Sequence, residues 1–290
     1  MAFISVIIPC YNAENFIDRC METIVSQTIG IENLEVILVD DASTDHTLDK
    51  LKAWERRYPD NVLVITYEEN LRQGGARNIG LQYAAADYIG FVDADDWLEP
   101  SMYEKLYAYA KEEAYDMVQG KFIREHHVGE YPVDNSRRRD VAYHFEKKQD
   151  FYVWDVSDVG DTGEFGSLCC TLLKKSLITE HNLHFPEHVA YEDNYWAAML
   201  HLYVKDLYIL DEIVYHYFMN MHSTVSAQNA LHQLDRLAVE VMVVEQYKSR
   251  GAFDTFRYKL ERDFIQRFYL NTLFIIFTRF QELPNIFDYM

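Results

Sequence analysis

The sequence predicts an α/β protein whose central sheet is mostly parallel and covered by helices on both faces. Over the first 120 residues, short continuous apolar runs alternate with amphipathic segments of helical length. A continuous apolar run is typical of a strand that is buried on both faces, as strands of parallel sheets are. Polar clusters follow these runs instead of interrupting them. Strand and helix therefore alternate along this half of the chain, as in a wound α/β fold.

Strands and helices are expected in turn in this first half. The strands are rich in Val, Ile and Leu, and they are expected at residues 4–8, 34–39, 62–66, 88–92 and 117–119. The helices are expected at residues 14–26, 45–57, 75–85 and 101–114. Ser43 or Thr44 would cap the second helix, because a side-chain oxygen there can accept a hydrogen bond from an unpaired amide.

The second half is less regular. Residues 121–166 are polar and aromatic without a clear period. After them the pattern predicts strands at 167–173, 207–210 and 213–217, helices at 174–181 and 192–204, and helical structure from 226 to about 281. We therefore expect one α/β domain with a C-terminal helical extension. The aromatic stretch at 264–280 is expected to pack on the domain, with a second copy of the chain or a membrane surface as alternatives.

The composition limits the class of partner and the compartment. Lys and Arg number 27 against 47 Asp and Glu, a net charge of −20. A nucleic-acid-binding protein needs a basic face, so we expect no nucleic-acid partner. The four cysteines show no CxxC spacing, and the apolar N-terminus lacks a basic leader region. Reduced thiols and no signal peptide or membrane span predict a cytoplasmic protein, with peripheral contact at the inner membrane face as an extension of that prediction.

Acidic side chains follow the fourth predicted strand, in the stretch Asp93-Ala-Asp-Asp96. Side chains two apart on an extended chain point the same way, so Asp93 and Asp95 can converge while Asp96 points elsewhere. Two carboxylates of this kind suit a hard divalent cation that also holds phosphate oxygens. A solvated turn that caps the next helix is the alternative. Because parallel strands end at one edge of the sheet, Tyr11 and the pair Asp40-Asp41 should lie at the same edge.

Four segments in order resemble a known family. They are Ser5-Val-Ile-Ile-Pro-Cys-Tyr-Asn12, Val39-Asp-Asp-Ala-Ser-Thr-Asp45, Asn70 with Gly75-Ala-Arg-Asn78, and Asp93-Ala-Asp-Asp96. Together they resemble the family 2 glycosyltransferases, inverting enzymes with the GT-A nucleotide-diphospho-sugar transferase fold. The resemblance is close over residues 4–100 and weaker at 185–193 and 222–226.

The resemblance implies a donor-nucleotide site. Pro9 and Tyr11 would lie against the nucleobase. Asp41 would accept the uracil imide hydrogen, with Asp40 as the less certain partner. Asn70 would contact the base or the ribose.

The resemblance also implies contacts to the ribose, the diphosphate and a metal. Asp93, with Ala94 beside it, would hold the nucleoside, and Asp95 would bind Mn²⁺ or Mg²⁺. Arg77 would face the diphosphate, and a salt bridge from Arg77 to Asp93 is the rival interpretation. His222 would be a further metal ligand, and Ser223 and Thr224 would bond the diphosphate.

For the second half, the resemblance points to Asp193 as the base that deprotonates the acceptor hydroxyl, with Glu192 as the fallback. Consecutive helical side chains diverge by about 100°, so only one of the two should face the donor. A carboxylate that simply favours the helix start is the alternative. Trp97 and Trp196 are the aromatic candidates for contact with the sugar or the acceptor, although most aromatic rings fill cores.

The implied function is an inverting, metal-dependent glycosyltransferase of the hexosyl- or N-acetylhexosaminyltransferase class. It would move sugar from a nucleotide-sugar donor, UDP-linked, to a carbohydrate or glycoconjugate acceptor in cell-surface polysaccharide synthesis. Residues 1–120 would bind the donor, 121–225 the acceptor, and 226–290 would form the helical extension, with contact to a membrane or a second copy. A non-catalytic nucleotide-sugar-binding or scaffold subunit of a glycan-assembly complex is the alternative. A nucleotidyltransferase would need a basic glycine-rich loop after the first strand, where Pro9-Cys-Tyr-Asn12 stands.

Overall fold

A computed structural model describes residues 2–126, 129–131, 140–148, 150–153, 168–219, 230–263, 265–266 and 270. The strands are β1 (Ile4–Cys10), β2 (Leu34–Asp40), β3 (Val62–Thr66), β4 (Tyr88–Phe91), β5 (Trp97–Leu98), β6 (Met117–His126), β7 (Gly129–Tyr131), β8 (Val141–His144), β9 (Glu146–Lys148), β10 (Phe151–Val153), β11 (Thr171–Lys174) and β12 (Asp206–Phe218). The helices are α1 (Ile17–Val25), α2 (Thr47–Arg57), α3 (Arg72–Tyr83), α4 (Met102–Glu112), α6 (Lys175–Glu180), α7 (Glu192–Tyr203), α8 (Ala230–Ser249) and α9 (Phe253–Asp263). The predicted alternation in the first half is confirmed.

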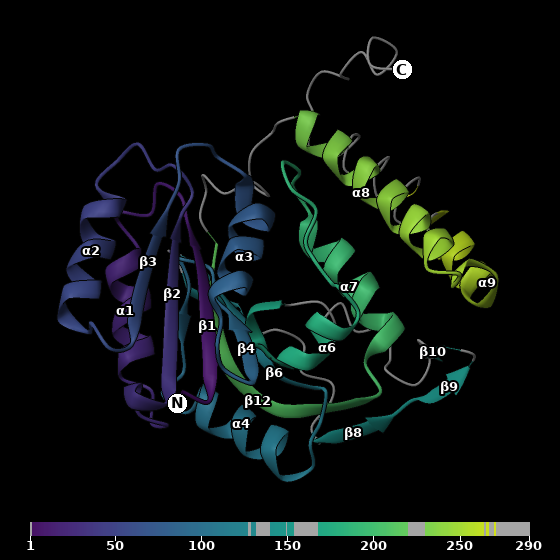
Figure 1. The fold of residues 1–290 in the computed structure, drawn as a ribbon, viewed down its shortest axis with the longest axis horizontal. Helices are drawn as coiled ribbons and strands as arrows, with labels where there is room; N and C mark the ends of the chain where they lie inside the picture. Colours follow the sequence, from purple (N-terminus) through teal and green to yellow (C-terminus); the bar gives the residue numbers. More distant parts are fainter. Residues whose placement is uncertain are drawn as a thin grey trace.

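The large sheet has the strand order β3-β2-β1-β4-β11-β6-β12-β5, with β7 beside β6 and β8 beside β12 (Figure 1). Its first four strands are parallel, as predicted. Their register pairs Cys10 with Asp40 and Ile7 with Phe91. The residues that follow β1, β2 and β4 therefore emerge at one edge of the sheet, where ligands of such folds bind.

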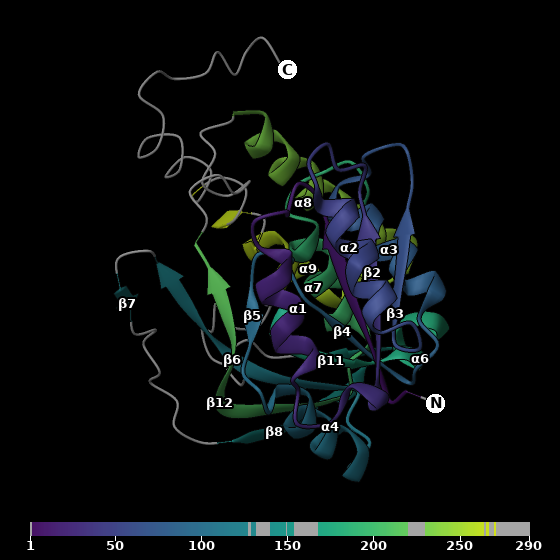
Figure 2. The same ribbon diagram turned by 90° about the vertical axis from the view of Figure 1, so that its left-hand side faces the viewer.

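Both faces of this sheet are covered. Gly80 of α3 lies against Ile7, so close that an added Cβ would be 2.4 Å from the Ile7 Cγ2 atom. The Phe91 ring, on the same face, meets Trp196 of α7 edge to face. Gly90 faces the other way, against the ring of Tyr103 in α4. Figure 2 shows α1 and α2 side by side in front of the strands. The result is a three-layer arrangement with a continuous apolar centre.

The second half of the sheet is mixed. β11 runs antiparallel to both β4 and β6, whereas β12 runs parallel to β6. The two short strands predicted at 207–210 and 213–217 are one strand, β12, and the strand predicted at 117–119 extends to His126 in β6. The register of β12 shifts around Ile213. Polar residues at this irregularity broke the apolar pattern, and one of them, Asp211, forms a salt bridge with the buried Lys121 of β6.

The predicted cap of α2 is wrong. The helix begins at Thr47, and its first amide donates to the carboxylate of Asp45, 3.0 Å away. Ser43 and Thr44 instead bond Asn12, which follows β1. These short polar side chains tie the ends of two neighbouring strands together. The segment therefore stabilises the site edge rather than the helix.

In the C-terminal extension, α8 lies beside α7 and α9 packs against α8 (Figure 1). The hydroxyl of Tyr247 in α8 donates to the backbone oxygen of Ala198 in α7, 2.9 Å away, and its ring is buried. Most of the aromatic stretch predicted at 264–280 lies outside the described residues. Among the described helices, none combines the length and the apolar character needed to cross a bilayer.

Candidate active site at the carboxyl edge of the sheet

The acidic loop after β4 is folded back onto β12 through Asp96. This carboxylate is fully buried, accepts a hydrogen bond from the hydroxyl of Tyr215 at 2.5 Å, and accepts another from the backbone amide of Phe218 at 2.7 Å. Burial, followed by the charges of Asp93 and Asp95, raises the pKa of Asp96 well above its ordinary value. The side chain of Asp96 thus bonds residues of β12, whereas that of Asp93 bonds Arg77. The role of Asp96 is to hold the loop in place.

Arg19 of α1 holds the same loop from its other side. A guanidinium nitrogen of Arg19 donates to the backbone oxygen of Asp95 at 2.6 Å. The guanidinium carbon lies 3.9 Å from the ring centre of Trp97, and that ring stacks on His216. Trp97 is therefore half-buried between two partners, and the loop backbone at Asp95 is fixed. Ala94, between the two carboxylates, is buried.

Arg77 joins the two halves of the site. It is only 2% exposed, and its guanidinium donates to Glu192 at 2.5 Å and to Asp93 at 2.7 Å. Burial alone would lower the pKa of Arg77, but the two carboxylates raise it above its ordinary value. The salt bridge to Asp93, the rival interpretation from the sequence, is thus formed. Arg77 brings the start of α7 against the loop that follows β4.

Asp193 is the accessible member of the Glu192-Asp193 pair. Glu192 is buried by its bond to Arg77, whereas Asp193 is exposed at the first turn of α7. Removal of water by the surrounding protein, followed by the charge of Glu192, raises the pKa of Asp193 to about 6. The residue before the pair, Tyr191, has the left-handed φ of 65°, which turns the chain sharply into the helix. An accessible carboxylate with a raised pKa is suited to accept a proton near neutral pH.

The residues predicted to meet a nucleobase lie together beyond β1 and β2. Tyr11 is 52% exposed and its ring is accessible. Asp41 is buried, and one of its carboxylate oxygens accepts from the Tyr67 hydroxyl at 2.8 Å and from the Leu71 amide at 2.7 Å. Burial raises the pKa of Asp41. Asn70 donates to the backbone oxygen of Asp41, which closes the loop around this carboxylate.

Asp40 and Pro9 lie deeper at the same edge. Both are buried, and Asp40 accepts a hydrogen bond from the Thr66 hydroxyl at 3.3 Å. Its other carboxylate oxygen is buried and has no hydrogen-bond partner among the described residues. Burial, followed by the charge of Asp40, raises the pKa of the Cys10 thiol. Neither Asp40 nor Pro9 is accessible to the degree that Tyr11 is.

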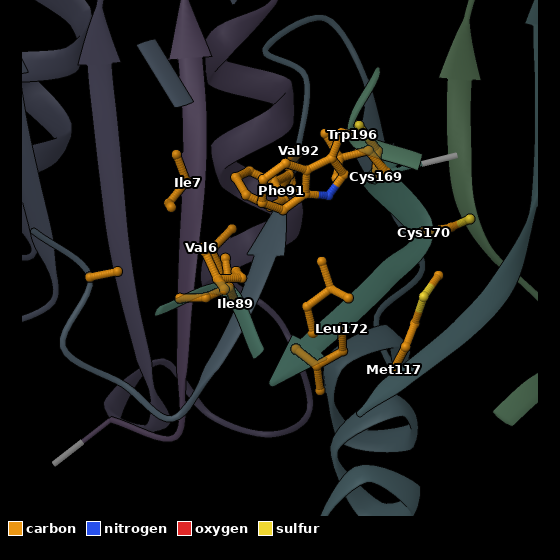
Figure 3. Close-up of a cluster of buried hydrophobic side chains, with 14 of the residues drawn as sticks. Val6, Ile7, Ile89, Phe91, Val92, Met117, Cys169, Cys170, Leu172 and Trp196 are labelled. Carbon is orange, nitrogen blue, oxygen red and sulfur yellow. The ribbon is translucent and has the colours of Figure 1, made fainter. Parts of the chain in front are cut away.

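The prediction that Trp196 contacts sugar is wrong. Its side chain is 1% exposed, and its ring stacks on Phe185 with centroids 4.0 Å apart. Figure 3 shows Trp196 beside Phe91 within the core. The helical spacing that placed it near the acidic pair turns it inward, away from Asp193. His222, Ser223 and Thr224 lie outside the described residues.

The side chains at this edge could hold Mg²⁺ or Mn²⁺ only if a bound molecule supplied further oxygen ligands. Among the described residues no group of three or more His, Cys, Asp and Glu side chains could hold a metal ion. Asp95 is half-buried on a loop of fixed backbone, and Asp93 is engaged by Arg77. Such cations are often held by one or two carboxylates plus the phosphate oxygens of a substrate. The site therefore suits a cation that arrives with a diphosphate.

The fold and this edge define a class: a wound α/β half joined to a mixed half, with carboxylates at the strand ends, is the GT-A arrangement. The sequence model of Glycosyl transferase family 2 matches residues 5–176, and the chain belongs to this family. The solved structure of Staphylococcus aureus TarS residues 1–349 in complex with UDP-GlcNAc superimposes with a TM-score of 0.68 at 21% identity, covering 83% of this chain and 66% of that one. The mannosyltransferase PcManGT from Pyrobaculum calidifontis, in complex with GDP-Man and Mn²⁺, gives a TM-score of 0.54 at 17% identity, covering 85% and 63% of the two chains.

Two curated relatives are named as glycosyltransferases. The poly(ribitol-phosphate) beta-glucosyltransferase of Bacillus spizizenii is 32% identical over 218 residues, which are 74% of this chain and 32% of that protein. Glycosyltransferase GlyG of Streptococcus pneumoniae is 30% identical over 228 residues, 74% of this chain and 70% of that protein. The chain thus spans about a third of the first of these relatives.

Several residues that build the site were missed from the sequence. Arg19 and Tyr215 hold the acidic loop, and Tyr67 holds Asp41. Arg19 lies in α1, Tyr215 in β12 and Tyr67 just after β3, and none carried a local signal, because each partner lies far away in the chain.

Proposed function

We propose that this protein is an inverting, metal-dependent glycosyltransferase that moves a sugar from a UDP-sugar to an acceptor hydroxyl in cell-surface polysaccharide or glycoconjugate synthesis. The observation that carries the proposal is the arrangement around Arg77, which buries Glu192 and leaves Asp193 accessible beside the Asp93 loop. Family membership and the names of the curated relatives support the reaction class.

In this proposal Asp193 acts as the general base. It takes the proton of the acceptor hydroxyl while that oxygen attacks the anomeric carbon. The bond from the anomeric carbon to the diphosphate breaks, and its electron pair leaves with the nucleoside diphosphate. Attack opposite the leaving group inverts the configuration, so an α-linked donor gives a β-linked product. Glu192, held in its pair with Arg77, is the fallback base that this arrangement disfavours.

The donor nucleotide would lie along the edge that β1, β2 and β4 share. The exposed ring of Tyr11 can stack on a flat base, which is worth about 1–3 kcal/mol in comparable sites. Asp41 would meet the imide hydrogen of uracil, with Asn70 beside it. Asp93, already oriented by Arg77, would lie near the ribose.

Asp95 would hold Mn²⁺ or Mg²⁺ together with the diphosphate, with His222 as a second protein ligand. When bound, such a cation offsets the charge that develops on the leaving diphosphate. Ser223 and Thr224 would bond the same phosphates. With a net charge of −20, the site needs the positive charge of this cation, because the donor phosphates approach several carboxylates.

We assign successive parts of the chain to different tasks. Residues 1–120 would bind the donor, residues 121–225 would complete the acceptor side, and residues 226–290 would form the helical extension. We propose a cytoplasmic enzyme that meets its acceptor at the inner membrane face, with the extension in contact with a membrane or a second copy. Trp97 would contact sugar only through the part of its ring that Arg19 and His216 leave uncovered.

The test is transfer from a panel of UDP- and GDP-sugars with manganese, followed for both hydrolysis and thermal stabilisation. The Asp193→Asn variant should bind UDP as the unchanged protein does and lose about 100- to 10,000-fold in turnover, because a general base contributes that much. Asp60→Asn, which alters an exposed carboxylate before β3, is the matched control and should retain full turnover. Transfer by Asp193→Asn at the unchanged rate would remove Asp193 from the role. Binding of UDP without transfer from any donor would favour the scaffold alternative.

A further inference from the structure

Asp235 of α8 lies where three segments of the site meet. One of its carboxylate oxygens accepts a hydrogen bond from the guanidinium of Arg72 at 2.6 Å and another from the backbone amide of Ala190 at 3.2 Å. Arg72 is the first residue of α3, and Ala190 lies just before α7. A single side chain of the C-terminal extension therefore joins the start of α3 to the start of α7.

The segments that Asp235 joins lead directly to the two ends of the proposed site. Beside Arg72, the Leu71 amide donates to the Asp41 carboxylate at 2.7 Å. The backbone oxygen of Leu71 also accepts from the amide of His188 at 3.2 Å. Three residues after Ala190 comes Asp193. The nucleobase end and the base end are thus linked both through this backbone bond and through the Asp235 carboxylate.

The neighbouring residue strengthens this junction. The guanidinium of Arg236 lies 5.7 Å from the ring centre of Tyr191. Tyr191 has the left-handed backbone conformation that turns the chain into α7. α8 therefore contacts both residues that precede Glu192. The direction in which Asp193 emerges depends on this turn, because a change there would rotate the first helical residues.

The contact at Asp235 is separate from the packing that holds α8 on the domain. Val239, Val243 and Tyr247 are buried farther along the helix, and the Tyr247 hydroxyl bonds the backbone of Ala198. At the far end, Arg250 donates to the backbone oxygen of His181 at 2.9 Å. The side chains of Arg72 and Asp235 are 42% and 22% exposed. An ion pair of that exposure contributes little to folding stability, so its effect would be on geometry.

We propose that Asp235 is a positioning residue that aligns Asp193 with the donor pocket, so that the C-terminal extension is a working part of the active site. This inference rests on the proposed function. The physical basis is that a carboxylate bonded to both a guanidinium and a backbone amide fixes two loops in one geometry. A misplacement of about 1 Å between reacting groups can reduce a rate by about 100-fold.

The experiment compares Asp235→Ala, Arg72→Ala and the double variant, with Glu245→Gln as the control for an exposed carboxylate on the same helix. We expect each single variant to lower kcat by about 10- to 100-fold, with UDP affinity in the presence of manganese changed by less than about threefold. The double variant should be no slower than the singles, because both remove one interaction. Asp235→Asn, which keeps an acceptor for Ala190, should recover part of the rate. Glu245→Gln should behave as the unchanged protein.

A readout that does not need turnover is amide hydrogen exchange. In Asp235→Ala, exchange should accelerate at residues 70–72 and 188–193 and stay unchanged along the rest of α7. Unchanged kcat and unchanged exchange in Asp235→Ala would overturn the inference. A general loss of thermal stability together with lost UDP binding would also overturn it, because the contact would then be structural. If the unchanged protein transfers no sugar from any donor, the proposed function fails, whereas the exchange result still decides whether Asp235 holds the two loops.

Discussion

The guanidinium of Arg77 and the carboxylate of Glu192 form a buried ion pair, with Nη1 and Oε1 2.5 Å apart, although 115 residues separate them in the chain. The second guanidinium nitrogen bonds Asp93, so one cation neutralises carboxylates from both halves of the fold. The pair also decides which acidic residue of α7 is available. Glu192 is turned inward, and Asp193 remains accessible.

Arg77→Met should destabilise the fold strongly. The change leaves Asp93 and Glu192 close together without a counter-charge, and breaking a buried pair in this way costs about 3–5 kcal/mol. The free energy of unfolding from urea titration measures the loss. Arg77→Lys keeps the positive charge but cannot bond both carboxylates as the guanidinium does, so its loss of unfolding free energy should be smaller. Arg257→Met, at an exposed arginine paired with Glu261, is the control and should have no measurable effect. A small loss for Arg77→Met would show that the pair is not buried as described.

Turnover should fall on the acidic side with an apparent pKa near that of Asp193, which desolvation by the surrounding protein and the charge of Glu192 raise to about 6. A base works only when it is deprotonated, so kcat is retained above this pKa and decreases by about tenfold per pH unit well below it. Initial rates at saturating donor and acceptor measure the profile. Asp193→Asn should lose most of its activity, and its remaining activity should not show this decrease at acidic pH. A profile that stays flat down to about pH 5 would exclude Asp193 as the base.

Metal binding and donor binding should depend on each other. Asp95 by itself supplies too few ligands for tight binding, so calorimetry should show weak uptake of Mn²⁺ without UDP and tighter uptake with it. In Asp95→Ala, the affinity for UDP with manganese should fall to its value without manganese. Asp60→Ala is the control, because this exposed carboxylate lies before β3 at the other edge of the sheet. Unchanged affinity in Asp95→Ala would refute the ligand assignment.

Tyr215→Phe should destabilise the protein by about 1–3 kcal/mol, because it leaves the buried Asp96 carboxylate with one fewer donor. The same hydroxyl accepts from the amide of Asp93, so the acidic loop should also loosen. Urea titration measures the stability, and the affinity for UDP reports on the loop. Tyr258→Phe, at a ring that is 80% exposed, should leave both unchanged. Equal stability of the two variants would show that the bond from Tyr215 to Asp96 does not stabilise the fold.

The first half of the fold was predictable because its information is local. Each parallel strand is a continuous apolar run, and the parallel arrangement brings Tyr11, Asp41 and Asp93 to one edge. The long strand β12 was not predictable, since its acidic interruption is compensated by Lys121 on another strand. Ser43 and Thr44 do not cap α2 because they bond Asn12, which follows β1, and the first amide of the helix donates to Asp45 instead.

The sequence by itself determined the alternation of strands and helices, the shared polar edge and the family, because hydrophobic period and motif spacing are properties of neighbouring residues. Only the tertiary structure decided that Arg77 is buried between two carboxylates, that Trp196 belongs to the core, and that Asp235 meets the site. These choices depend on contacts between residues far apart in the chain. A side chain's accessibility and charge environment are set when those contacts form.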